Sequence, residues 1–516
     1  MKKLLVLTLT LFILTCSLWA GVDTILSLKG YYTGNNIPSS GLAYNKSTER
    51  YEWATATDVD TWNNLDNGWW MKRQDYWMQA YDKTSFLDFG FDASYKNLHM
   101  VFRLDIMQDV LKNLQGPSSL STNIPFVGAL LDLSFPRVGF IEYKTKDELL
   151  YVSLGRRLLK WGPGSYDMAL SDSQPYLDGL YTEFNIPFSA TWNFSYNYNV
   201  ITPKMWMNYN SDTVNHDVQK TFFMHKISFN NDYFRLSLAE INNVYGKVPN
   251  LLDASPFIIW HNSNQDDHSN VFLHLTMEGK VGPVRGFIGF DMDDFDLPHE
   301  GHSKKPSAMG FSTGIEWHVF DGEPNGKAKF DYRDYTIKEA SLKTENGLNI
   351  GAEWYYLTPL MYNRNKDFNG AGKFTIPFQF VSLIGSGYVY YEDAYYLGFK
   401  YGPNSQLVKL YAEYNARPFE AKLSLEYLLR GRYGIESTYG DRDKLDDMGL
   451  DNLFAIFGDK THTLLIDTAF AYYLQDAFKI NANFSWQQDI THNKGTYCLK
   501  IGLSLNPLEV DWKHLF

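Results

Sequence analysis

The sequence FSATWNFSYNYNV, residues 188–200, decides the fold of this chain because apolar and polar residues alternate along it without a break. The apolar members are Phe188, Ala190, Trp192, Phe194, Tyr196, Tyr198 and Val200. Successive side chains of a β-strand point to opposite faces, so the segment has one aromatic face and one polar face. A strand of a soluble sheet usually has about five or six residues, whereas a strand that crosses a bilayer needs roughly nine to eleven.

The same alternation recurs along the chain, and at several places its polar face is charged. It is clear in residues 87–95 and 98–106, which predict a hairpin about Lys96-Asn97, and again in 419–427, 478–486 and 497–505. The charges expected on the polar faces are Arg103, Arg285, Lys400, Lys409, Lys422, Lys479, Lys500, Asp88, Asp92, Asp105, Glu413, Glu420 and Glu426. Alternation alone also permits a β-sandwich, so strand length, aromatic content and the number of hairpins must decide between the two folds.

Composition favours a membrane barrel. Aromatic residues make up 16% of the 516 residues, yet the mean hydropathy is −0.33. A barrel with an aromatic-girdled apolar exterior and a polar interior combines these two properties. The net charge of −12 argues against nucleic acid as a partner, because phosphate binding depends on clustered Lys and Arg.

The N-terminus predicts export. Lys2 and Lys3 precede an apolar run over residues 4–14, and Ala20-Gly21 offers a cleavage point, so residues 1–20 are expected to be a signal peptide. Cys16 lies in a loose lipoprotein-type box, which leaves its lipidation open. No later apolar run approaches the roughly twenty residues of a membrane helix. We therefore expect an outer-membrane protein of a diderm bacterium that spans the membrane with strands.

These observations predict an all-β fold, a transmembrane antiparallel β-barrel of about 18 strands. Residues 21–85 are expected to form an N-terminal segment, with a strand near 24–32 and a possible plug or loop, and residues 86–516 the barrel. Short turns and long loops should alternate, with the long loops outside. The expected outer loops are 109–136, 161–187, 243–269, 293–307 and 431–461; topology between 341 and 395 is not readable.

The densest local signal is GRRLLKWGPG, residues 155–164. Gly162-Pro163-Gly164 should end the preceding strand sharply and leave three cations and an indole at its rim. One interpretation is a girdle Trp followed by a loop turn. The other is a sugar site, in which Trp161 stacks on a pyranose and Arg156 or Lys160 pairs with uronate carboxylates.

The order Gly155-Arg156-Arg157, Lys160 to Gly164, Leu170-Ser171-Asp172 and Pro175 resembles the signature of the capsule-assembly Wzi family of outer-membrane proteins. The specific part covers about twenty residues, and the rest of the likeness is one of length and barrel pattern. The resemblance implies a barrel of roughly eighteen strands with a blocked lumen that retains capsular polysaccharide or exopolysaccharide at the cell surface. The family's helical N-terminal plug is not recognisable here. The expected ligand-binding residues are Arg156, Arg157, Lys160, Trp161 and Asp172.

Other chemistries find less support. The acidic groups 291–296 and 441–451 lack the Gly and distal Glu of an EF-hand loop, so solvated loop charge is the simpler interpretation. We expect no metal, cofactor or catalytic residue. The expected partners are surface polysaccharide, outer-membrane lipid with lipopolysaccharide, and the barrel-assembly machinery. A porin-like channel for oligosaccharides or other nutrients and an outer-membrane enzyme remain alternatives to a lectin-like barrel.

Overall fold

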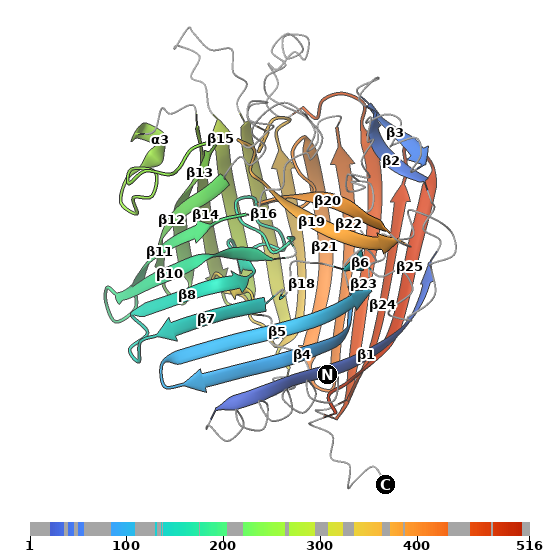
Figure 1. The fold of residues 1–516 in the computed structure, drawn as a ribbon, viewed down its shortest axis with the longest axis horizontal. Coiled ribbons are helices and arrows are strands. Elements are labelled where there is room, and N and C mark those ends of the chain that lie inside the picture. Colours follow the sequence, from blue (N-terminus) through green and yellow to red (C-terminus); the bar gives the residue numbers. More distant parts are fainter. Residues whose placement is uncertain are drawn as a thin grey trace.

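Eighteen antiparallel strands close into one barrel (Figure 1). The computed structural model describes residues 21–35, 40–45, 50–55, 84–108, 130–131, 136, 138–174, 176–203, 220–263, 268–294, 308–322, 335–363, 372–384, 387–431, 455–475 and 478–507. Each barrel strand pairs with the barrel strands before and after it in the sequence. The predicted barrel of about 18 strands is therefore confirmed.

The barrel strands differ in length and follow the chain in order. They are β1 (Val22–Asn35), β4 (Thr84–Tyr95), β5 (Leu98–Gln108), β7 (Val138–Lys144), β8 (Leu150–Arg157), β10 (Leu177–Pro187), β11 (Asn193–Ile201), β12 (Lys220–Asn230), β13 (Phe234–Tyr245), β14 (Ser269–Val281), β15 (Val284–Asp294), β16 (Ala308–Phe320), β18 (Gly347–Leu357), β21 (Ser405–Ala416), β22 (Phe419–Arg430), β23 (Thr461–Gln475), β24 (Phe478–Asp489) and β25 (Lys494–Leu505). Closure is made by β1, which pairs with β4 at its beginning and with β25 at its end. The barrel thus includes a strand from the N-terminal segment.

The strand predicted over residues 188–200 begins later than the alternation indicates. Residues 188–192 form the turn between β10 and β11, in which the Phe188 N–H donates to the Trp192 carbonyl oxygen at 2.8 Å. The Ser189 hydroxyl accepts from the Thr191 and Trp192 amides. The alternation continues through the turn because small polar residues also suit turns, so the sequence pattern cannot mark where the strand begins.

The polar face of β11 points into the barrel, as predicted. Asn197 and Asn199 are 3% and 0% exposed, whereas Tyr196 and Tyr198 lie on the outer wall. Outward positions are apolar along most of the wall. On β15 the outward positions are Val284, Gly286, Ile288, Phe290 and Met292. This is the inverse of a soluble protein, in which the apolar face would be covered.

Two expectations about loops need correction. Asp291 and Asp293 do not lie in an outer loop; they belong to β15, where both side chains are buried on the inner face. Residues 161–187 are not an outer loop either, because 177–187 form β10 and the preceding residues fold into the barrel. The parts 109–129 and 432–454 of two other expected loops lie outside the described residues.

Smaller elements accompany the barrel. They are the hairpin β2 (Ser40–Asn45) and β3 (Arg50–Thr55), the sheet of β6 (Leu130–Leu131), β19 (Thr375–Ile384) and β20 (Gly387–Tyr396), the parallel pair β9 (Leu159–Lys160) and β17 (Ile337–Lys338), and the short helix α3 (Trp260–Ser263). In the part of the chain that the structure describes, no helix is long and apolar enough to cross a membrane.

A substitution at the middle of the exterior tests this orientation. Ile288 is the third of the five outward positions of β15 and is 51% exposed, so Ile288→Arg should place a charge near the bilayer midplane. We expect a loss of about 2–4 kcal/mol in the free energy of unfolding, against about 0–1 kcal/mol for Val281→Arg at the end of β14. Both free energies of unfolding can be measured by urea titration in vesicles, with heat-modifiable gel mobility as the readout of folded protein. Equal losses would contradict the assigned depth.

Candidate functional site

The chain turns inward after β8 and crosses the barrel interior before it joins β10. This inward segment comprises residues 158–174 and 176. Its first residues, β9, pair in parallel with β17, which comes from the connection between β16 and β18. The Trp161 N–H then donates to the Leu170 carbonyl oxygen at 2.9 Å, and the Ser171 N–H to that of Leu397 at 2.9 Å. Two segments distant in sequence therefore hold the inward segment by backbone hydrogen bonds.

An apolar core forms around the inward segment. From the segment and the wall strands it contains Leu159, Trp161, Met168, Ala169, Leu170, Tyr176, Leu177, Tyr181, Ile201, Phe222, Met224, Ala239, Ile241, Phe272, Tyr355, Leu357, Leu407, Leu428 and Leu465. These strands run from β10 to β23, which lie on roughly opposite sides of the ring. Side chains of the connection from β18 to β21, such as Tyr362 and Phe399, complete the core. The interior between these walls is therefore packed with side chains.

Glycines of the motif permit this path. Gly162 has a φ of 70°, and a Cβ there would lie 2.1 Å from Asp167 Oδ2. A Cβ on Gly164 would lie 2.5 Å from the Tyr355 hydroxyl oxygen. Asp167 in turn accepts from the Ala169 and Leu170 amides at 2.8 and 2.7 Å. Trp-Gly-Pro-Gly thus provides a turn tight enough to pack against the wall.

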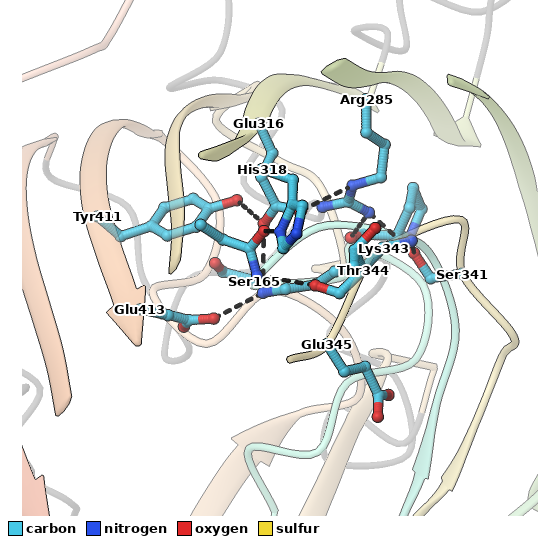
Figure 2. Close-up of polar contacts among 12 residues, drawn as sticks. Ser165, Arg285, Glu316, His318, Ser341, Lys343, Thr344, Glu345, Tyr411 and Glu413 are labelled. Atoms are coloured by element: carbon cyan, nitrogen blue, oxygen red, sulfur yellow. Dashed lines mark hydrogen bonds and ion pairs between the residues drawn. The ribbon is translucent and has the colours of Figure 1, made fainter. Parts of the chain in front are cut away.

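Charged groups on the wall fasten a second segment, residues 335–346, which also folds inward (Figure 2). Lys343 Nζ lies 3.2 Å from Glu316 Oε2 and 2.6 Å from Glu413 Oε2. Arg285 Nη1 donates to the Ser341 hydroxyl at 2.8 Å, and its Nε lies 3.3 Å from Glu316 Oε1. The same Nη1 lies 3.1 Å from the Pro163 carbonyl oxygen, so Arg285 contacts both inward segments.

Glu339 joins the two inward segments to the wall. Its carboxylate lies 3.2 Å from Lys226 Nζ and 3.3 Å from Arg235 Nη1, and it accepts from the Ser237 hydroxyl at 2.7 Å and the Gly162 N–H at 3.0 Å. Burial acts to raise the pKa of this carboxyl, but the two cations and the two donors outweigh it and hold the pKa well below its ordinary value. The group is therefore a buried anion with four partners.

The structure separates the five predicted ligand-binding residues. Arg156 shares the outward face of β8 with Leu154, at the end where the long loops begin. Its guanidinium binds Asp178 through two bonds, of 2.6 and 2.7 Å, and lies 4.0 Å from the centre of the Tyr176 ring. Arg156 is therefore the member of the set that lies on the outer rim.

Arg157 and Lys160 point inward. Arg157 pairs with Glu142 at 2.5 Å and donates to the Tyr335 carbonyl oxygen at 2.7 Å. Lys160 donates to the Ser165 carbonyl oxygen at 2.9 Å, and burial lowers the pKa of its amine. Both side chains thus bind parts of the protein itself.

Trp161 and Asp172 lie along the inward segment. Trp161 is 2% exposed, with Lys226 Nζ 4.9 Å above its ring and the His274 ring 6.0 Å away. Asp172 is half-buried and attracts the charge of Lys160. The structure therefore places Trp161 in the core rather than in a membrane girdle.

Several residues that contribute to the packed interior were not predicted from the sequence. Ser341 and Lys343 lie in the stretch 341–395, whose topology is not readable from the sequence, and Glu339 precedes that stretch without a motif signal. Tyr166 carries no motif signal either; its hydroxyl donates to Glu426 at 2.7 Å. Among their wall partners, alternation identified the charges of Arg285, Glu413 and Glu426. It did not identify Lys226, Arg235 or Glu316. It carries no information about which connection folds back between two walls.

The fold and interior define an outer-membrane β-barrel with inward-folded connections. No family profile matches the chain, and no curated protein matches it. Among solved structures it is similar to Wzi of Escherichia coli, an outer membrane protein involved in group 1 capsule assembly and a carbohydrate-binding β-barrel. Identity is 12% over 93% of this chain and 84% of Wzi, with a TM-score of 0.49.

The chain is also similar to OccK11 (OpdR) of Pseudomonas aeruginosa, with 9% identity, 94% and 95% coverage and a TM-score of 0.42. A BenF-like porin from Pseudomonas fluorescens gives 10% identity, 94% and 97% coverage and a TM-score of 0.41. The expected resemblance to Wzi is thus found at the level of the barrel fold. Since a carbohydrate-binding barrel and a porin both appear, the comparisons do not separate those two functions.

The turn of the motif can be tested with two glycines of positive φ. Gly162→Ala should lower the free energy of unfolding by about 1–3 kcal/mol, since it adds a collision with Asp167 to backbone strain. At Gly282 the φ is 57° and an added Cβ would have nothing within 4 Å, so Gly282→Ala adds backbone strain without a collision. Its free energy of unfolding should fall by less than that of Gly162→Ala. Urea titration of both variants decides; equal losses would mean that the motif is not packed as described.

Removal of one buried charge should be costly. Glu339→Gln leaves Lys226 and Arg235 buried without their counterion, so we expect a loss of about 3–5 kcal/mol in the free energy of unfolding. Glu148→Gln, which removes one side of an exposed pair with Lys144, should have almost no effect.

The same variant has a pH signature. Because its pKa is lower in the folded state than the unfolded value of about 4.3, Glu339 stabilises the fold above that pH, and this contribution is lost as the pH falls through the folded pKa. The difference in the free energy of unfolding between wild type and Glu339→Gln should therefore become smaller in acid. A constant difference from neutral pH down through strong acid would contradict a buried ionised carboxylate.

Proposed function

We propose that this barrel binds or retains capsular polysaccharide or exopolysaccharide at the cell surface, as a lectin-like protein in capsule assembly and not as an enzyme. The observation that carries the proposal is the packed interior: the inward segment and its apolar core join β10–β14 to β18–β23. Passage of a solute needs a hydrated lumen, whereas retention of a polymer needs a rigid rim. The proposal includes a signal peptide over residues 1–20 and insertion by the barrel-assembly machinery.

The rim at the ends of β8 and β10 is the proposed contact with the polymer. Arg156 and Asp178 form a bidentate ion pair there, with exposed fractions of 19% and 34% for their side chains. A uronate carboxylate has the geometry of the Asp178 carboxylate, so it can take the same place on the guanidinium. Asp172 is proposed to accept hydrogen bonds from sugar hydroxyls. Arg157, Lys160 and Trp161 then serve to position this rim.

A pair of substitutions separates binding from structural support. Arg156→Gln should weaken binding of an acidic polysaccharide several-fold at low salt and less at high salt, because charges near the surface are screened within about 8–10 Å. Asp178→Asn removes the competing carboxylate and should strengthen the same binding. Lys144→Gln, at the opposite end of the barrel wall, is the control for loss of one positive charge. Surface plasmon resonance against a panel of acidic and neutral polymers measures all three.

If Arg156 only supports the fold, both substitutions at the pair should weaken binding and lower stability together. The porin alternative has its own readout in planar bilayers. A retaining barrel should give little single-channel current, whereas a porin gives steady steps. Absence of binding to every polymer of the panel, together with clear ion conductance, would overturn the proposed function.

A further inference from the structure

The connection between β13 and β14 has an unusual surface. Residues 246–263, here called the side segment, include α3 and lie beside β13 in Figure 1. Five large apolar side chains of the side segment are strongly exposed: Val248 81%, Leu251 90%, Leu252 65%, Phe257 85% and Ile259 60%. A soluble surface rarely carries such a cluster without a partner.

Two polar side chains of the side segment, Asp253 and Trp260, lie against the protein, whereas Asn250 and His261 are exposed. Asp253 is 1% exposed, and its carboxylate lies 3.0 Å from Lys247 Nζ and accepts from the Asn250 N–H at 2.8 Å. The Trp260 indole N–H donates to the Leu252 carbonyl oxygen at 3.2 Å. Apolar side chains outside and satisfied polar groups inside are the polarity expected of a surface whose solvent is hydrocarbon.

The side segment lies against the outer wall of the barrel. Tyr196 and Tyr198 point outward from β11, and their hydroxyls donate to the carbonyl oxygens of Pro256 and Ala254; the second bond is 2.6 Å long. The Phe257 ring stacks on that of Tyr196, with 6.0 Å between centroids. The apolar surface of the segment is therefore continuous with the exterior of the strands.

A polar pair lies beneath this cover. His225 and Glu240 face outward from β12 and β13, with 3.1 Å between His225 Nε2 and Glu240 Oε2. The Trp260 N–H donates to the same oxygen at 2.9 Å, and the Trp260 ring stacks on His225 with 4.2 Å between centroids. Glu240 is 5% exposed.

Glu240 occupies a row of the wall that is apolar on the next strands. It is paired across the sheet with Leu273 of β14, and Leu273 with Met292 of β15. Without the side segment, the Glu240 carboxylate would lie among side chains that face lipid. An ionisable group in that position costs free energy. Trp260 and its neighbours replace that lipid contact.

We propose that the side segment is a membrane-facing cover, whose exposed apolar side chains contact the acyl chains of the outer-membrane lipid and continue the apolar exterior across β11–β13. Its occupant is lipid hydrocarbon, because the patch extends an exterior that already faces lipid, and because the buried Asp253 and Trp260 of the segment have their partners within the protein. Glu240 and His225 hold Trp260, and through it the cover, against the wall.

The experiment places a fluorescent label at the patch. Phe257→Cys is made in the full chain with Cys16 and Cys498 replaced by Ser, labelled with bimane and reconstituted into phosphatidylcholine vesicles. Ile288→Cys on the outer face of β15 is the lipid-facing reference, and Glu148→Cys in the turn between β7 and β8 is the aqueous reference. Heat-modifiable mobility checks that each labelled barrel is folded.

Doxyl-labelled lipid should quench the label at Phe257 as strongly as at Ile288 and far more than at Glu148, and iodide should show the opposite order. Leu251→Cys, 90% exposed, should behave like Phe257→Cys and covers the case in which the first variant fails to fold. Iodide quenching at both positions equal to that at Glu148 would overturn the proposal. So would protection from both quenchers with cross-linking between barrels, since the patch would then bind a second copy.

Discussion

Closure of the sheet is the constraint on which the rest of the structure depends. A bilayer offers no water to unpaired N–H and C=O groups, so a strand-built protein can cross it only without a free edge. β1 meets this requirement by pairing with β4 through its first half and with β25 through its second half. Once the ring is closed, each strand has one face to lipid and one to the interior. The chain must then fill that interior or leave it wet.

On the inner face of the wall, charged residues of opposite sign are paired across adjacent strands. Across β18, β21 and β22 the paired residues Glu353, Lys409 and Glu426 alternate in sign, and all three are buried. This order places a cation between two carboxylates and leaves acceptors for backbone groups of the inward segments, as Glu353 does for the Ser165 N–H. The apolar core and the charged rows therefore support the same segments from different sides.

Much of the wall was predictable from sequence, because a period of two is a local property. Residues 87–106 gave both strands and their turn, and the buried polar face of Asn197 and Asn199 followed from the alternation. The start of β11 was not predictable, because Ser189 and Thr191 suit a turn as well as a strand. The path of the inward segment was not predictable either, because it depends on partners such as Glu339 and Leu397 that are remote in the sequence.

The parallel pair of β9 and β17 has a consequence for biogenesis. It joins Leu159 to Ile337, so the interior contact waits until strands β8 through β16 have been synthesised and brought together. Contacts between such distant residues form slowly because the intervening chain must first be ordered. Both inward segments are also tied at each end to wall strands, unlike a plug at a chain terminus. They are therefore built in as the cylinder closes and cannot be withdrawn afterwards as a separate unit.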